Sequence, residues 1–188
     1  IGIINKSLWH ESISIYYFLL VLIKSIIYIY IHKSEKRSKE KLVYNTHYYM
    51  DFNSQKKYVG ILETEYEGVK FYFIDNEDFF RRSGIAQDKD GTYFDDNDER
   101  CIFYVRSVLE TIKKLRWTPD IIHVNGWISA LAPMYIKKSY ASDPFFANSK
   151  IIYSIYNDNF ECKIREGFET RALFDEIEES DVEILKGD

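Results

Sequence analysis

The stretch from residue 119 to residue 138 constrains the fold of this chain more than any other. It reads PDIIHVNGWISALAPMYIKK: a short apolar run closed by His123, a turn at Asn125 and Gly126, and a segment with apolar residues at helical spacing. This order predicts a buried strand, a turn and a helix. In open α/β sheets, ligands bind at the carboxyl ends of the strands. We therefore expect His123 and Asn125 to point at a crevice.

Further strands and a long helix are predicted on either side of this unit. Residues 150–156 (KIIYSIY) are typical of a strand, which would complete a β-α-β unit with strand 120–124 and a helix from 127 to about 140. Upstream, the acidic segment 95–100 favours the start of a helix, and apolar residues follow it at helical spacing. We also expect strands at residues 60–68 and 69–74, a surface loop at 79–93 and a helix around 169–178.

Length and charge exclude some classes of function. With 188 residues, the chain has room for one domain and a sizeable core. Its formal net charge of −5 argues against a nucleic-acid-binding protein, which needs a basic surface. Cys101 and Cys162 lie far apart and lack the spacing of metal ligands, so we expect reduced thiols in a cytoplasmic protein.

The first 50 residues differ from the rest of the chain. Residues 13–31 form an apolar run interrupted only by Ser14, Lys24 and Ser25, and a basic tract follows. The run is just long enough for a transmembrane helix, although Lys24 would cost about 2.5–3.5 kcal/mol in the bilayer. A pair of strands is a second possibility, because Ile and Tyr favour sheets. The third is a truncated or mistranslated flank, since Ile, Tyr, Lys, Ser and Asn are what an AT-rich reading frame yields. A signal peptide is not expected, because no small-residue cleavage site follows the run.

The motif at residues 119–138 resembles one in bacterial glycogen and starch synthases. There the segment reads Pro-Asp-Ile-(Ile/Val)-His-x-His-(Asp/Gly)-Trp-x-(Thr/Ser)-(Ala/Gly)-Leu-x-Pro. The similarity continues in YFIDNEDFFRR at residues 72–82, DDNDERCIFYVRSVLE at 95–110 and KIIYSIYND at 150–158. Several motifs in the family's order, over roughly residues 68 to 160, are more specific than any one of them. Before about residue 50 we find no resemblance.

The resemblance implies a fold and a division of the chain. The family has the GT-B fold, whose N-terminal half is a Rossmann-like α/β domain with a parallel sheet flanked by helices. We therefore expect residues 51–188 to form part of the N-terminal glycosyltransferase domain. Residues 1–50 form an atypical apolar and basic segment that does not match the family.

The resemblance also implies an activity. The family extends α-1,4-glucan from ADP- or UDP-glucose with retention of configuration, and needs neither a metal nor another cofactor. The glucan lies on the N-terminal half, and the nucleotide-glucose binds mainly to a second domain that would begin beyond this chain. We expect the chain to be an incomplete half that has no turnover alone. A non-catalytic glucan-binding or membrane-anchored interaction module is the alternative.

Candidate site residues follow from matching positions in the family's motifs. His123 and Asn125 are the expected catalytic residues. By the same resemblance, residues that would contact substrate are Trp127, Asp96, Asn97, Arg100, Tyr156 and Asn157. From spacing alone, the acidic start of the helix would instead provide capping and a surface ion pair.

The chain departs from the family at three places. Asn125 stands where the family usually has its second His, and Tyr156 replaces the His of a Thr-(Ile/Val)-His-Asn strand end, where Asn157 keeps the last position. An amide can bond a hydroxyl group but cannot carry a proton. Residues 1–60 contain nothing like the family's Lys-x-Gly-Gly-Leu loop, which approaches the donor's phosphates, so donor binding is expected mainly elsewhere.

Overall fold

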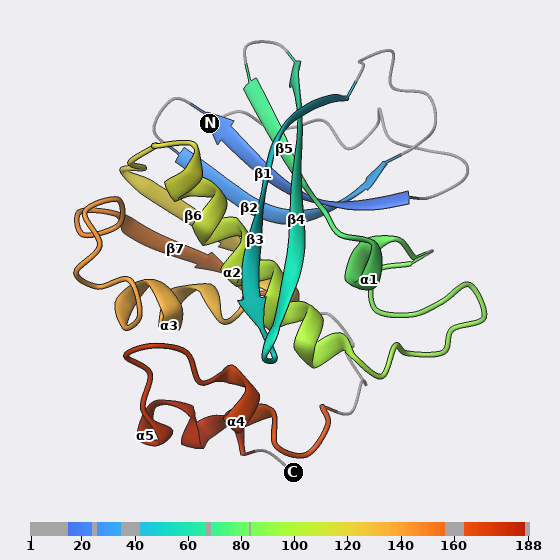
Figure 1. The fold of residues 1–188 in the computed structure, drawn as a ribbon, viewed down its shortest axis with the longest axis vertical. Helices are drawn as coiled ribbons and strands as arrows, with labels where there is room; N and C mark the ends of the chain where they lie inside the picture. The colour runs from blue at the N-terminus through green and yellow to red at the C-terminus, as the bar shows by residue number, and fades with distance from the viewer. Residues whose placement is uncertain are drawn as a thin grey trace.

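A mixed seven-stranded sheet forms the centre of the molecule (Figure 1). The computed structural model describes residues 15–23, 26–34, 42–66, 69–82, 84–156 and 164–186. Within these, the strands lie in the order β3-β4-β5-β1-β2-β6-β7. Their bounds are β1 Ile15–Ile23, β2 Ile26–Ser34, β3 Val43–Phe52, β4 Gln55–Tyr66, β5 Val69–Asp75, β6 Ile121–Asn125 and β7 Lys150–Ser154.

The sheet has a parallel part and an antiparallel part. β2 pairs in parallel with β6, and β6 pairs in parallel with β7. β3, β4 and β5 form an antiparallel meander, and β1 is antiparallel to both β5 and β2. The predicted α/β class is confirmed. The parallel arrangement is restricted to the three strands that lead to the predicted site.

The apolar run of residues 13–31 contributes two strands to the middle of this sheet. β1 and β2 are paired antiparallel from Ile15 with Ser34 to Ile23 with Ile26. Of the three interpretations of this run, the pair of strands is the one that the structure shows. Within the described part of the chain, no helix combines the length and the apolarity that a membrane crossing needs.

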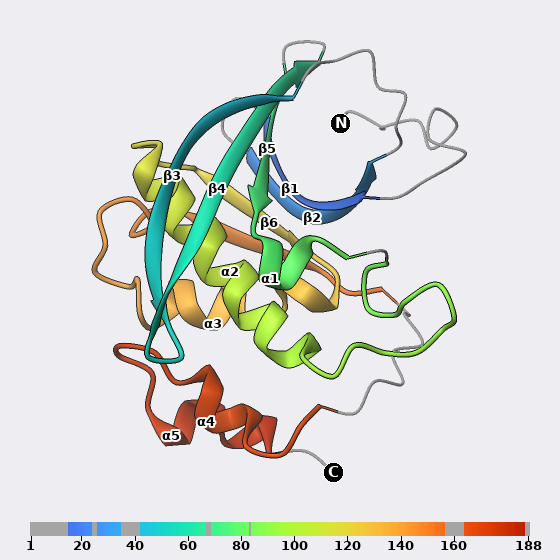
Figure 2. The ribbon, with the colours of Figure 1, turned by 45° about the vertical axis from the view of Figure 1, so that its right-hand side comes forward.

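The long helix α2 (Asn97–Lys114) carries the largest part of the core. Its apolar stripe, including Ile102, Val105 and Ile112, is buried, as the spacing predicted. β3 packs on this helix, since the Tyr48 hydroxyl group donates a hydrogen bond of 2.7 Å to the Ser107 carbonyl oxygen. In Figures 1 and 2, the ribbon of β3 and β4 curves past α2, and the C-terminal helices lie at the bottom of both views.

Two predicted helices are shorter than expected. The helix expected from residue 127 to about 140 is a 3-10 turn, η2 (Trp127–Ser129), followed by α3 (Ala132–Lys137), which starts anew around Pro133. The helix predicted around 169–178 is present only at its start, as α4 (Phe168–Ala172), which ends where Leu173 becomes extended. A capping box at Glu178 then starts α5 (Glu179–Val182), which η3 (Glu183–Leu185) follows.

The segment predicted as a surface loop at residues 79–93 begins inside a helix. α1 (Glu77–Phe80) is capped by Asn76, whose side-chain oxygen accepts a hydrogen bond of 2.9 Å from the Phe79 backbone N–H. Both Phe79 and Phe80 are buried, so the loop proper starts at Arg81.

Candidate functional site

The carboxyl ends of β6 and β7 bring His123 and Ser154 together. The two strands pair in register, with Asn125 opposite Ser154. The imidazole Nε2 of His123 lies 2.7 Å from the Ser154 hydroxyl oxygen. Burial lowers the pKa of His123, because an imidazolium ion loses hydration there. His123 is therefore a neutral hydrogen-bonding group near pH 7, held in place by the neighbouring strand.

Asn125 and Tyr156 form a second contact at the same edge. The Tyr156 hydroxyl group donates a hydrogen bond of 2.9 Å to the side-chain oxygen of Asn125. The side-chain nitrogen of Asn125 donates to the His123 carbonyl oxygen at 3.1 Å. Tyr156 is 56% exposed, so the pair faces solvent. These two departures from the family's motifs are thus direct neighbours.

A glycine turn positions the residues that follow β6. Gly126 has φ = 72° and ψ = 176°, a conformation that side chains disfavour. The Ser129 hydroxyl group closes the turn by donating to the Asn125 carbonyl oxygen at 2.6 Å. Trp127 is only partly buried and packs against the core. Its ring therefore contributes to packing at the point where the turn leaves the sheet.

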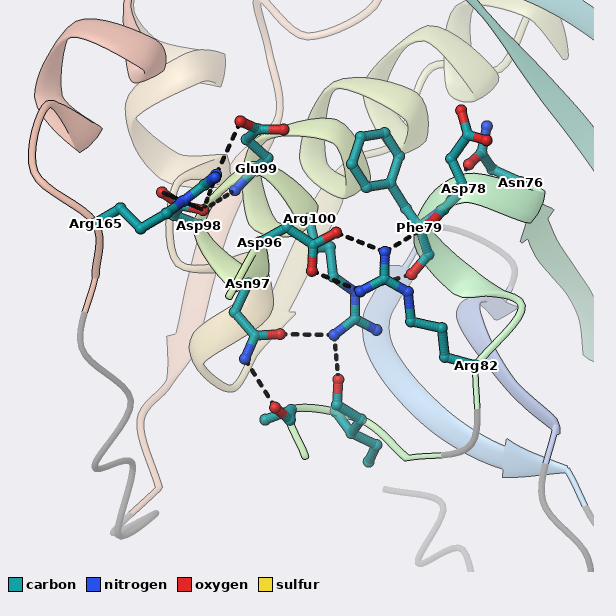
Figure 3. A network of polar contacts seen from close by, with 12 residues as sticks. Asn76, Asp78, Phe79, Arg82, Asp96, Asn97, Asp98, Glu99, Arg100 and Arg165 are labelled. Carbon is teal, nitrogen blue, oxygen red and sulfur yellow. Dashed lines mark hydrogen bonds and ion pairs between the residues drawn. The ribbon is translucent and has the colours of Figure 1, made fainter. Parts of the chain in front are cut away.

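The other predicted residues lie in a network at the start of α2 (Figure 3). Asp96 accepts two hydrogen bonds of 2.6 Å from Arg82, and Asn97 donates to the Ala86 carbonyl oxygen at 2.8 Å. Arg100, which is 1% exposed, donates to the side-chain oxygen of Asn97 and to the carbonyl oxygens of Phe79 and Ile85. The described bonds of this network tie the loop after α1 to the helix.

Arg100 is a structural cation in this network. Burial, together with the nearby Arg82, lowers the pKa of Arg100 to about 10. Both guanidinium groups lie over the Phe94 ring, at 5.2 Å for Arg82 and 5.0 Å for Arg100. Because Arg100 is so deeply buried, an approaching sugar would have to move the loop to reach it. The ion-pair part of the sequence-based interpretation therefore agrees with the contact of Asp96 with Arg82. The capping part does not, because Asp96 precedes α2 but makes no capping hydrogen bond with its side chain.

Two residues important to these clusters were missed from the sequence. Ser154 could have been identified only as a polar residue within the predicted strand 150–156, which ends at the predicted crevice. Asp98, whose side chain is 1% exposed, accepts hydrogen bonds of 2.7 Å from Arg165 and 2.5 Å from Arg171. Burial raises the pKa of Asp98, whereas hydrogen bonds from Arg165, the Glu99 backbone and Arg171 lower it by more. The pKa of Asp98 is therefore below its ordinary value.

The predicted site residues thus fall into two groups. His123, Asn125 and Tyr156 are joined by hydrogen bonds at the carboxyl edge of the sheet, where Trp127 begins the next turn. The network at α2 holds Asp96, Asn97 and Arg100. Asn157 lies outside the described residues. Within those that are described, no three His, Cys, Asp or Glu side chains lie close enough together to hold a metal ion.

The chain has an α/β fold of the open-sheet class, with polar side chains gathered where parallel strands end, the edge at which such sheets bind ligands. A solved structure of this fold is the "Catalytic domain of Starch Synthase IV from Arabidopsis thaliana bound to ADP and acarbose". Its TM-score is 0.54 at 21% identity, over 66% of this chain and 24% of that one. The family model described as "Starch synthase catalytic domain" matches residues 21–184, and the chain belongs to this family.

Relatives in bacteria agree with this assignment. The chain is 41% identical over 124 residues to a protein named "Glycogen synthase" from Clostridium botulinum, and 37% identical over 123 residues to one of the same name from Lachnospira eligens. Each match covers 65% of this chain and 25% of the relative, so the chain spans about a quarter of the length of these proteins. The family match starts at residue 21, inside the segment 1–50 that we set apart.

Proposed function

We propose that this chain supplies the acceptor side of a retaining α-1,4-glucosyltransferase of the glycogen synthase type, acting in the cytoplasm. Family membership and the names of the relatives support glucan synthesis. The observation that carries the proposal is the placement of His123, Asn125 and Tyr156 at the carboxyl ends of parallel strands. There Tyr156 bonds to the Asn125 side chain, and Asn125 bonds to the His123 backbone. These neutral side chains match the hydroxyl groups of a sugar, which both donate and accept hydrogen bonds.

The chemistry that we assign to this set is binding and orientation. Asn125 cannot transfer a proton, and the lowered pKa of His123 keeps its imidazole neutral. The set therefore holds a glucose unit by hydrogen bonds. The charge that develops on the departing diphosphate and on the reacting sugar is stabilised electrostatically, mainly by groups of a second domain. ADP-glucose or UDP-glucose is the donor, and no metal or other cofactor takes part.

A chimeric enzyme tests this proposal. The matching segment of the Clostridium botulinum relative is replaced by this chain's residues, and transfer of labelled glucose to glycogen is measured with ADP-glucose and with UDP-glucose. We expect transfer from one of them, and a loss of at least about tenfold on His123→Ala, the cost of one well-placed hydrogen bond. The control is Ile184→Ala, at a side chain that is 89% exposed. A folded chimera that uses neither donor contradicts the proposal.

A non-catalytic glucan-binding module is the second candidate. It is favoured by Asn125 and Tyr156, because neither can act as the proton-carrying imidazole that the family has at these positions. A folded chimera that retains glycogen but transfers no glucose would support this candidate. Restored transfer on Asn125→His together with Tyr156→His would show that the two departures are the cause. For the chain alone, we expect no turnover with either donor.

A further inference from the structure

Ser154 joins the two parallel strands whose ends carry the candidate site. β6 and β7 lie side by side in the sheet (Figure 1), and the Ser154 hydroxyl oxygen of β7 is 2.7 Å from Nε2 of His123 in β6. The Ser154 carbonyl oxygen accepts a hydrogen bond of 3.2 Å from the Gly126 backbone N–H. One residue of β7 therefore contacts both the imidazole ring and the turn that follows β6.

The register of the two strands makes this contact diagonal. The Cα partner of His123 is Ile152, whose side chain has no polar atom, and Ser154 is the partner of Asn125. Because successive side chains of a strand point to opposite faces, these four residues share one face of the sheet. The side chains of β6 that alternate with them are fully buried on the other face. The imidazole ring therefore lies on the less buried face, where its hydrogen-bond partner in β7 is Ser154.

The length of the contact favours the hydroxyl group as the donor. Donating hydroxyl groups form bonds of about 2.7–2.8 Å, whereas N–H donors lie about 2.9–3.0 Å from an oxygen acceptor. Burial lowers the pKa of His123, so the ring is neutral near pH 7 and one of its nitrogens carries a lone pair. A hydroxyl group that donates to Nε2 pairs with that lone pair. The hydrogen atom of the neutral ring is then on Nδ1.

We propose that Ser154 is a positioning residue, whose hydroxyl group donates to Nε2 of His123 and so fixes the orientation of the ring and keeps its hydrogen atom on Nδ1. This inference rests on the proposed function. In water, the neutral side chain of histidine prefers the hydrogen atom on Nε2, so Ser154 selects the tautomer that solvent disfavours. Ser154 acts on the bound glucose unit only through His123. The site then has one fixed arrangement of donor and acceptor at this ring.

NMR spectroscopy of the full chain tests the tautomer directly. The chemical shifts of the two ring nitrogens are measured at about pH 8, where the ring is neutral. Among the four histidines, His123 is identified by the loss of its signals in His123→Gln. We expect the Nδ1–H tautomer in wild type, and a shift of the population toward Nε2–H by about fivefold in Ser154→Ala. Wild type with the hydrogen atom on Nε2, or an unchanged tautomer in Ser154→Ala, overturns the proposal.

Ser149→Ala is the matched control at the other end of the same two strands. The Ser149 hydroxyl group donates a hydrogen bond of 2.6 Å to the Pro119 carbonyl oxygen, just before β7 and β6 begin. Its removal should leave the tautomer of His123 as in wild type. Ser154→Thr keeps a hydroxyl group and should also retain the wild-type tautomer. Urea unfolding confirms that each variant is folded. Equal effects of Ser149→Ala and Ser154→Ala on the His123 shifts would show a merely structural role and overturn the proposal.

The chimeric enzyme separates this role from the proposed function. Ser154→Ala should reduce glucose transfer about two- to tenfold, the range of one hydrogen bond, and Ser154→Thr should retain it. Because Ser154 acts through His123, Ser154→Ala should cause no further loss when His123→Ala is already present. A chimera that responds to His123→Ala but not to Ser154→Ala overturns the positioning role and leaves the proposed function intact. A folded chimera without transfer contradicts the proposed function, while the spectra of the chain alone still decide between the two tautomers.

Discussion

Replacing Asp98 by Asn should destabilise the protein by detaching its C-terminal segment. The Asp98 side chain, 1% exposed, is shared by Arg165 and Arg171, which belong to the described C-terminal residues 164–186. Asparagine keeps the volume but removes the charge, so two guanidinium groups lose their common partner. Breaking a buried ion pair costs about 3–5 kcal/mol. Because Arg165 and Arg171 are 42% and 24% exposed and regain some water, we expect roughly 2–3 kcal/mol.

Urea unfolding measures this loss directly, and limited proteolysis shows where it occurs. Glu77→Gln is the control, because it breaks the ion pair with Arg81 at the surface, where such pairs contribute little. Cleavage after residue 164 should become faster in the Asp98 variant while the sheet stays protected. If Asp98→Asn and Glu77→Gln unfold at the same urea concentration, the shared carboxylate does not hold the segment.

The Asp98 carboxylate should also make the free energy of unfolding depend on pH, with stability lost at acid pH. The folded-state pKa of Asp98 is below its ordinary value of 3.8, so the unfolded chain binds the proton more readily. Its contribution is therefore complete above the ordinary pKa and disappears as the pH falls through the lower, folded-state pKa. Wild type should lose more stability than the Asp98→Asn variant over this acid range. Parallel stability curves for the two proteins would refute the reasoning.

Three further predictions concern the site and its support. The NMR titration of His123 should give a pKa below its ordinary 6.5, with a matching loss of stability as the pH falls through that range; an unshifted midpoint would contradict its burial. Gly126→Ala should cost about 1–3 kcal/mol in urea unfolding, because φ is 72° there, whereas Ala130→Gly, at an exposed position, should cost less. Arg100→Lys should cost about 2–4 kcal/mol, since lysine cannot donate to three oxygens from one plane; a change under about 0.5 kcal/mol would count against this.

Patterns of residues close in sequence predicted those helices and strands whose formation depends on such residues alone. β6 and its turn follow from an apolar run and from Gly126, and α2 follows from its acidic start and its apolar stripe. Pro133 limited the next helix in a way that periodicity alone did not reveal. For residues 13–31, composition was compatible with a helix or with strands, and only the pairing of β1 with β5 and of β2 with β6 distinguishes them.

The contacts that span the chain could not be predicted. Asp98 belongs to the acidic first turn of α2, but its partners Arg165 and Arg171 lie 67 and 73 residues further along the chain. Similarly, Ser154 acquires its place beside His123 only through the register of β6 with β7. The order of the residues gives no sign of such partners, because spatial proximity arises from the sheet as a whole.

The parallel pairing of β2 with β6 has a consequence for how the protein is made. The pairs that β1 to β5 form with one another all lie within residues 15–75. The pair of β2 with β6 instead joins Ile26 to Ile121. Closing so large a loop is entropically unfavourable and slows folding. During translation, the ribosome must therefore release the second half of the chain before β2 gains its outer neighbour. Until then, one side of β2 is an unpaired edge open to other nascent chains.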